Sequence, residues 1–153
     1  MIYVPKELID TTWRNVGAST SGKVVRIQND HKKTQRALTV YVYENFLGLR
    51  EDAAGAGIYV YHVVLEAFSR VLPRPRRVGK NQVELARGNQ HRLEGSESEK
   101  SIEQSSEPYA LRYVHEALTE DTDDVVLSDQ EREHIFGVLQ AAIICLHEAC
   151  GRE

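Results

Sequence analysis

The sequence predicts an all-α fold, with four to five helices in a bundle-like arrangement of two helical hairpins joined by a long flexible connection. Three observations favour this fold. Apolar residues recur every three or four positions in several segments, which is the spacing of one helix face. Proline, glycine and a capping box mark the ends of these segments. A stretch rich in Ser and Glu separates the apolar segments into two groups.

The first 33 residues indicate their structure least clearly. Pro5 can open a short helix that reaches Trp13, because proline suits the first turn of a helix. Residues 17–22 (GASTSG) are small, so we expect a loop there. Residues 23–27 (KVVRI) fit a short strand by alternation, and they equally fit the start of a helix. Whether strand occurs within residues 23–43 therefore stays open.

The next segment is apolar on both sides of a helical projection. Leu38 and Leu49 bound a stripe at helical spacing, and Val40 and Tyr43 add apolar side chains between its members. Residues 39–43 (TVYVY) alone resemble a strand in their β-branched and aromatic content. The length of the whole segment favours a helix, and its all-round apolar character predicts that it is buried.

A second apolar stripe precedes the middle of the chain. It runs from Ile58 to Leu72 at helical spacing and ends before Pro73, which cannot continue a helix. Residues 53–57 (AAGAG) are expected to loosen the backbone between the two apolar segments.

Residues 73–107 form the predicted connection. They begin with PRPRR and end with the polar run GSESEKSIEQSS, in which Ile102 is the one large apolar residue. Such a run cannot bury enough surface to offset the entropy of ordering it, so we expect a mobile connection. A helical turn or a hairpin around Gly88 fits the stretch between these two ends.

The C-terminal third carries the clearest helix signals. Pro108 can open a helix that an acidic run at residues 119–124 closes. Ser128 and Glu131 form a capping box, in which each side chain bonds the other residue's backbone amide. The helix that follows is predicted to reach about Cys150, with Cys145 in its apolar stripe and Cys150 near the exposed chain end.

Composition indicates one ordinary globular domain over residues 1–153, long enough to bury a core. Two cysteines five residues apart fit neither a disulfide framework nor a four-ligand zinc site, which favours a reducing compartment. The N-terminus lacks a basic stretch followed by an apolar core, and no run of eighteen apolar residues occurs. We therefore expect a cytoplasmic protein without a membrane partner.

The charges divide unevenly along the chain. Residues 1–92 hold 15 Lys and Arg against 8 Asp and Glu, whereas residues 93–153 hold 4 against 15. The net charge is thus +7 for the first part and −11 for the second. The asymmetry indicates a basic face and an acidic face that neutralise one another within the chain or between copies.

No motif predicts catalytic residues, a metal site or a cofactor. Residues 17–23 (GASTSGK) match the glycines and lysine of a phosphate-binding loop, but Val24 replaces the hydroxyl that would bind magnesium. Neither His115 nor His147 has the second histidine that a zinc-protease helix requires. A carboxylate-bridged metal bundle would need two Glu-x-x-His pairs, and only Glu131 and His134 form one. Its other candidate ligands would be His62, Glu66, His115, Glu116, His147 and Glu148.

The remaining candidate site is a basic arm within residues 70–80. Five cations occur there without an acidic residue: Arg70, Arg74, Arg76, Arg77 and Lys80. We expect this arm to bind an anion or a partner, preferably the acidic residues of 116–133 in the same chain or in another copy.

The sequence thus favours a non-enzymatic helical module for protein interaction that self-associates into a homo-oligomer, with another protein as the second choice of partner. A nucleic-acid accessory protein is the alternative, with salt-dependent and unspecific binding, because the arm contains no aromatic residue to stack on bases. A metal-binding helical bundle is the third hypothesis.

Overall fold

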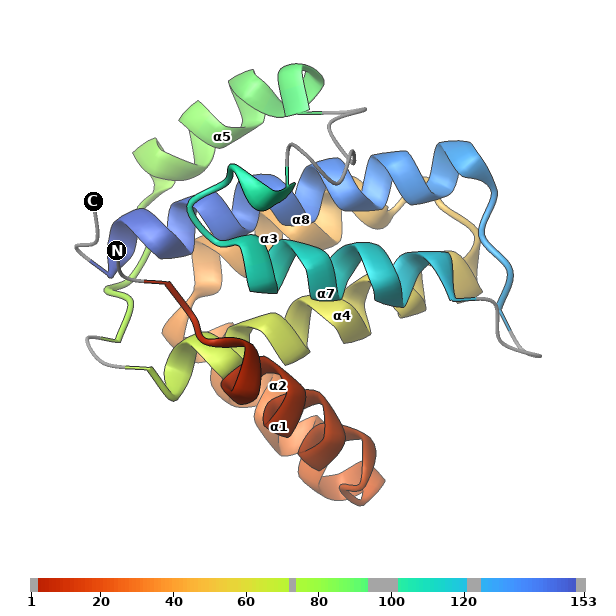
Figure 1. Ribbon diagram of the computed structural model, residues 1–153. Helices are drawn as coiled ribbons and strands as arrows, with labels where there is room; N and C mark the ends of the chain where they lie inside the picture. Colours follow the sequence, from red (N-terminus) through yellow and green to blue (C-terminus); the bar gives the residue numbers. More distant parts are fainter. Residues whose placement is uncertain (1–2, 72–73, 94–101, 121–124, 151–153) are drawn as a thin grey trace.

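The computed structural model describes residues 3–71, 74–93, 102–120 and 125–150. Within these ranges the protein is all-α, as predicted, and no strand occurs. Seven helices replace the expected four to five (Figure 1). They are α1 (Lys6–Gly17), α2 (Ser21–Thr34), α3 (Arg36–Phe46), α4 (Glu51–Ser69), α5 (Lys80–Leu93), α7 (Pro108–Thr119) and α8 (Asp129–Ala149).

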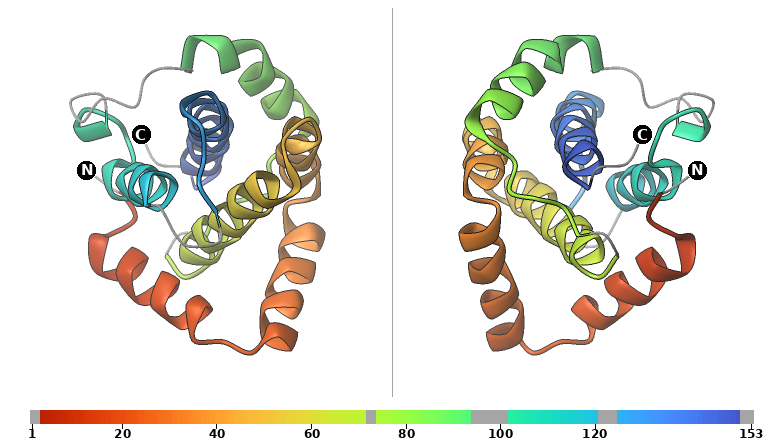
Figure 2. Two further views of the ribbon diagram at one scale, coloured as in Figure 1. Left: turned by 90° about the vertical axis from the view of Figure 1, so that its right-hand side faces the viewer. Right: turned by 90° about the vertical axis from the view of Figure 1, so that its left-hand side faces the viewer.

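The helices surround α8 and do not form two hairpins (Figure 2). α3, α4, α5 and α7 all pack against α8, and α1 and α2 pack on α4. An unbroken buried run from Ile135 to Ile143 shows why: this part of α8 is apolar on every side except Gln140, so it needs neighbours all round. The helix of the sequence that looked best capped is therefore the centre of the fold.

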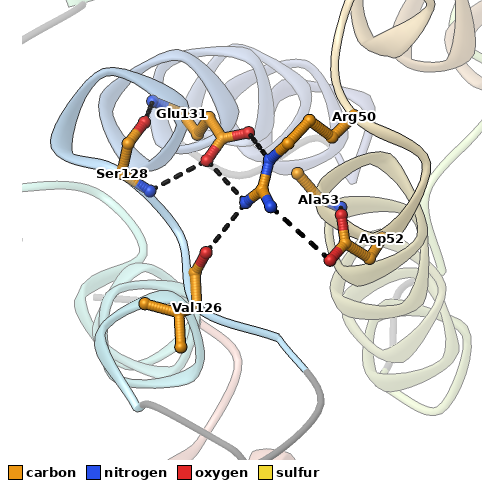
Figure 3. Close-up of polar contacts among 6 residues, drawn as sticks. All are labelled: Arg50, Asp52, Ala53, Val126, Ser128 and Glu131. Carbon is orange, nitrogen blue, oxygen red and sulfur yellow. Dashed lines mark hydrogen bonds and ion pairs between the residues drawn. The ribbon is translucent and has the colours of Figure 1, made fainter.

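The capping box predicted before α8 is present and is tied to the start of α4 (Figure 3). Ser128 Oγ accepts the Glu131 backbone N–H at 3.1 Å, and the Ser128 N–H donates to the Glu131 carboxylate at 2.8 Å. Arg50 donates to both carboxylate oxygens of Glu131 and to the backbone carbonyl of Val126. Its guanidinium, followed by the Ser128 amide, lowers the pKa of Glu131 to about 2.

The predicted loosening at residues 53–57 does not occur, because these residues lie inside α4. Gly57 faces the core, where an added Cβ would lie 2.9 Å from a ring carbon of Phe46 on α3. The glycine thus permits the close approach of α3 and α4.

The stretch with open strand and helix alternatives is helical in both of its parts. Residues 23–27 belong to α2 and residues 39–43 to α3, and the two helices separate at Gln35. The buried Gln35 side chain donates to the Arg76 carbonyl and accepts the Val78 N–H, each at 2.9 Å. These bonds hold residues 74–79 in an extended course beside α2 and α3.

The predicted mobile connection is ordered over much of its length. The Arg76 N–H donates to the Ala149 carbonyl at the end of α8, and α5 follows immediately and packs along α8. Val78 and Val83 are buried and fix this segment to the core. They are two single apolar residues that form no helical stripe in the sequence. The rest of the predicted connection that is Ser- and Glu-rich, residues 94–101, lies outside the described residues.

A buried carboxylate fixes the N-terminal segment to the core. Glu107 accepts the Val4 N–H at 2.8 Å and lies 2.6 Å from His147 Nδ1, with both side chains almost fully enclosed. Cys150 is buried beside this end of α8, so its expected exposure was wrong. In the described part of the chain, no helix is long and apolar enough to cross a membrane.

Candidate partner-binding groove

The outer face of α3 forms the floor of a groove. Arg36, Val40, Tyr43 and Leu47 recur at spacings of three and four, which places them on one side of the helix. Val40 is 47% exposed and Leu47, just beyond the helix, is 81% exposed. The prediction that this segment is buried all round is therefore wrong on one side of the helix, where apolar side chains lie on the surface.

Two adjoining hollows make up this groove, which we call the α3 groove. One, of about 780 Å³, lies between α3 and the end of α2, where Asn29, Lys32 and Lys33 line it. The other, of about 570 Å³, lies between α3 and residues 77–87. Both are lined by Arg36, Val40, Glu44 and Arg77, so they form one continuous surface on either side of α3.

Cations dominate the α3 groove. Its lining contains Lys32, Lys33, Arg36, Arg77, Lys80 and Arg87, against the carboxylates of Glu44 and Glu84. Arg87 lies 3.3 Å from Glu44 and 3.6 Å from Glu84, so these three charges largely compensate one another. No ion pair with a carboxylate of the described chain compensates the other five cations.

The predicted basic arm is divided by the structure. Arg77 and Lys80 line the α3 groove, and Arg70 pairs with Glu66 at 3.2 Å. Arg74 and Arg76 are exposed and are not among the residues that line the groove. No ion pair joins the arm to the described residues of 116–133, so the expected neutralisation within one chain is not found there. Pairing between copies stays a prediction.

Sequence reasoning missed four of the six groove cations, namely Arg87 and three that lie together at the α2–α3 junction. Lys32, Lys33 and Arg36 surround the α2–α3 junction and meet the arm through the Arg77 guanidinium, which donates to the Lys33 carbonyl at 3.2 Å. The run HKKTQR was the available signal. Its connection to residue 77 depends on the Gln35 bonds, which no local pattern reveals.

A buried polar network lies beneath Tyr43, at the edge of the groove. Tyr43 Oη is 2.6 Å from His62 Nε2, and His62 Nδ1 is 2.9 Å from His31 Nδ1. His31 Nε2 is 3.1 Å from a Glu66 carboxylate oxygen, and the second oxygen accepts from Arg70. Burial, and secondly the charges of His31 and Lys32, lower the pKa of His62 to about 3. The bond from His31 lowers the pKa of Glu66.

The candidate metal ligands of the sequence do not form one cluster, although His62 and Glu66 both contact His31. Glu131 is occupied by the capping box and Arg50, His134 contacts the Asn45 carbonyl, and His147 contacts Glu107. Among the described residues, no group of three or more His, Cys, Asp or Glu side chains is arranged to hold a metal ion. The glycine-rich run that resembles a phosphate-binding loop covers the end of α1, a turn at residues 18–20 and the start of α2, which Thr20 caps, so the loop expected over residues 17–22 is confined to that turn.

A separate hollow of about 380 Å³ lies between α1, α4 and α7. Its lining includes the exposed aromatic residues Trp13 and Tyr59 and the carboxylates Glu116 and Glu120. Its charge is thus opposite to that of the α3 groove.

Comparisons with known proteins assign no relatives to this chain. No family model matches it, and searches of curated proteins and of solved structures found no match.

Proposed function

We propose that this protein is a helical interaction module that binds an acidic, amphipathic segment of another protein along the α3 groove. One observation carries the proposal: exposed Val40 and Leu47 lie on a floor surrounded by five cations that form no ion pair with a carboxylate of the described residues. An amphipathic helix can place its apolar side chains on such a floor and its carboxylates against the rim. The rim charges then select the partner, and the apolar floor adds affinity.

The groove suits a protein segment better than a nucleic acid. Its exposed floor is aliphatic at Val40 and Leu47, whereas proteins that bind single-stranded nucleic acids combine a cationic groove with aromatic rings on which bases stack. The one half-buried aromatic residue of the first hollow, Tyr43, already has the Lys32 ammonium 5.5 Å from its ring centroid. Its hydroxyl also bonds His62, so the ring is fixed by contacts within the protein.

A second copy of the chain is a less suitable partner. The basic groove and the acidic residues Glu116 and Glu120 lie on different elements. Unless a two-fold axis lets both pairs form at once, pairing them would be a head-to-tail contact. Such contacts repeat into filaments unless the rotation closes a ring. We therefore assign the groove to a different protein and treat self-association as an outcome of the test.

The test is fluorescence anisotropy with a labelled peptide of about 18 residues, roughly five helical turns, carrying Leu at helical spacing and Glu between. We expect binding that weakens with added salt, because exposed charges are screened. The same peptide with Gln for Glu is the ligand control. An oligonucleotide tests the nucleic-acid alternative, and sedimentation at several protein concentrations tests self-association.

Matched charge reversals locate the site. Lys33→Glu with Arg36→Glu is expected to raise the Kd of the acidic peptide by roughly 5–30-fold, at about 0.5–1 kcal/mol for each reversal. Arg14→Glu with Lys23→Glu makes the same change of charge at exposed positions outside the groove. Equal losses in the two double variants, or tighter binding of the oligonucleotide than of the peptide, would overturn the proposal.

A further inference from the structure

The network beneath Tyr43 is a continuous chain of hydrogen bonds between the α3 groove and Glu66. It crosses three helices, from Tyr43 on α3 through His62 on α4 and His31 on α2 to Glu66 on α4. The two imidazole rings are nearly parallel, with an angle of 9° between their planes. His31 is 5% exposed and His62 is 3% exposed, so protein groups make the contacts that water would otherwise make.

A neutral histidine carries a proton on one ring nitrogen and accepts at the other, so each hydrogen bond in this chain restricts the next. Glu66 is a carboxylate, and His31 Nε2–H therefore donates to it. In the neutral network His31 Nδ1 must then accept from His62 Nδ1–H. That leaves His62 Nε2 as an acceptor, and the Tyr43 hydroxyl proton is used to donate to it.

When His31 is protonated, the His31–His62 bond and the His62–Tyr43 bond reverse their direction, and the bond from His31 to Glu66 keeps its direction. His31 Nδ1–H then donates to His62 Nδ1, and His62, which stays neutral, carries its proton on Nε2. His62 Nε2–H donates to Tyr43 Oη, and the hydroxyl hydrogen of Tyr43 stays on its oxygen but no longer has an acceptor within the network. Tyr43 is one of the residues that line the groove, and the proposed coupling requires its hydroxyl hydrogen to reach an acceptor bound there.

The geometry points to Tyr43 as a carboxylate-binding position of the α3 groove, where binding of a carboxylate from the acidic partner is coupled to uptake of one proton by His31. This inference rests on the proposed function and names a contact and a regulation of that same site. The proton comes from solvent and stays on His31, and no covalent bond changes. Because binding takes up a proton, it is expected to strengthen toward acid pH.

The other charged and titratable groups around the network do not compete for this proton. Lys32 on α2 lies over the Tyr43 ring and adds a cation at the same position of the groove. Arg70, the residue after α4, binds the outer oxygen of Glu66; the His31 bond, and after it Arg70, lowers the pKa of this carboxyl. Tyr61 on α4 packs its ring beside His62, but its hydroxyl bonds Thr39. Of the two imidazoles in the network, His31 is the one that contacts the Glu66 carboxylate.

The inference is tested first in the free protein, by NMR of the histidine side-chain nitrogens between about pH 5 and pH 8. We expect His62 to carry its proton on Nδ1 at the basic end and on Nε2 at the acidic end, while His31 becomes doubly protonated. A His62 tautomer that does not change, or protonation of His62 in place of His31, overturns the relay. This result does not depend on whether any peptide binds.

Calorimetry then tests the coupling. The acidic peptide is titrated at about pH 6.5 in two buffers of different ionisation enthalpy. A buffer-dependent enthalpy that reports proton uptake of up to one per peptide supports the coupling, and its loss in Tyr43→Phe and in His31→Gln assigns it to this chain. Tyr59→Phe in the other hollow is the matched control and keeps the uptake. Peptide binding whose enthalpy does not depend on the buffer overturns the coupling. A change of the His62 tautomer without any peptide binding leaves the relay standing, but it overturns the proposed partner and with it the carboxylate-binding role of Tyr43.

Discussion

Gly57 and Gly55 lie two residues apart in α4, and replacing each by alanine is expected to change stability in opposite directions. At Gly57 an added Cβ would lie 2.9 and 3.1 Å from two ring carbons of Phe46 and 3.2 Å from Ile135 Cγ2. Phe46 and Ile135 are fully enclosed, so neither can move into free space. Overpacking of this kind costs about 1–3 kcal/mol.

The gain in helix propensity from glycine to alanine, about 1 kcal/mol, opposes this cost. Gly57→Ala is therefore expected to destabilise the fold by roughly 0–2 kcal/mol. At Gly55 nothing lies within 4 Å of the added Cβ, so Gly55→Ala keeps the whole gain of about 1 kcal/mol. The two variants should differ by roughly 1–3 kcal/mol in free energy of unfolding.

Urea unfolding followed by far-UV circular dichroism measures both values under one set of conditions. Equal stabilisation by the two alanines would refute the reasoning, because it would mean that α4 does not approach Phe46 and Ile135 as closely as described. A difference in the reverse direction would refute the assignment of Gly57 to the core.

Three further predictions test other contacts. Glu107→Ala leaves the Val4 N–H and His147 without their buried partner and is expected to lower the free energy of unfolding by about 2–5 kcal/mol. The control Glu103→Ala removes an exposed ion pair and is expected to cost less than about 0.5 kcal/mol. Equal losses of the two variants in urea unfolding would contradict this. Burial raises the pKa of Cys145 to about 11, so iodoacetamide should label this thiol only after unfolding, and rapid labelling of the native protein, detected by mass spectrometry, would be inconsistent with its place in the core. The pKa of His62 is lowered from 6.5 to about 3, so between these pH values the unfolded chain binds a proton at His62 and the folded chain does not. The contribution of His62 to the free energy of unfolding is therefore complete above pH 6.5. It falls by up to about 1.4 kcal/mol per pH unit as the pH drops toward 3. The stability advantage of wild type over His62→Gln should therefore shrink on acidification, and an advantage that stays constant would exclude this origin.

Local signals predicted the elements that they could reach. The capping box at Ser128 and Glu131 and the apolar stripe behind it marked α8 correctly, because both depend on residues three or four apart. Pro108 marked the start of α7 for the same reason. These signals say nothing of how helices are arranged, and the two hairpins expected from helix order gave way to a central α8.

The parts that could not be predicted depend on contacts distant in sequence. Gln35 divides α2 from α3 by bonding residues 76 and 78, and α5 is stabilised by α8 although its own apolar content is low. Val40 was expected to be buried because composition does not say which face of a helix a neighbour covers. In the candidate site, the charge run identified Arg77 and Lys80, and only the fold brings them to Arg36. His31 and His62 are 31 residues apart, and no spacing rule joins them.

Chemical-shift mapping tests the central claim most directly, because it locates a bound peptide on the whole described surface at once. The acidic amphipathic peptide is titrated into the isotope-labelled protein while the backbone amides are followed. The account predicts the largest shifts at Val40, Glu44, Leu47 and Gly79, with the amides of Trp13 and Ala56 at the other hollow unchanged. Shifts that gather around Trp13 and Ala56, or that appear nowhere on α3, would contradict it.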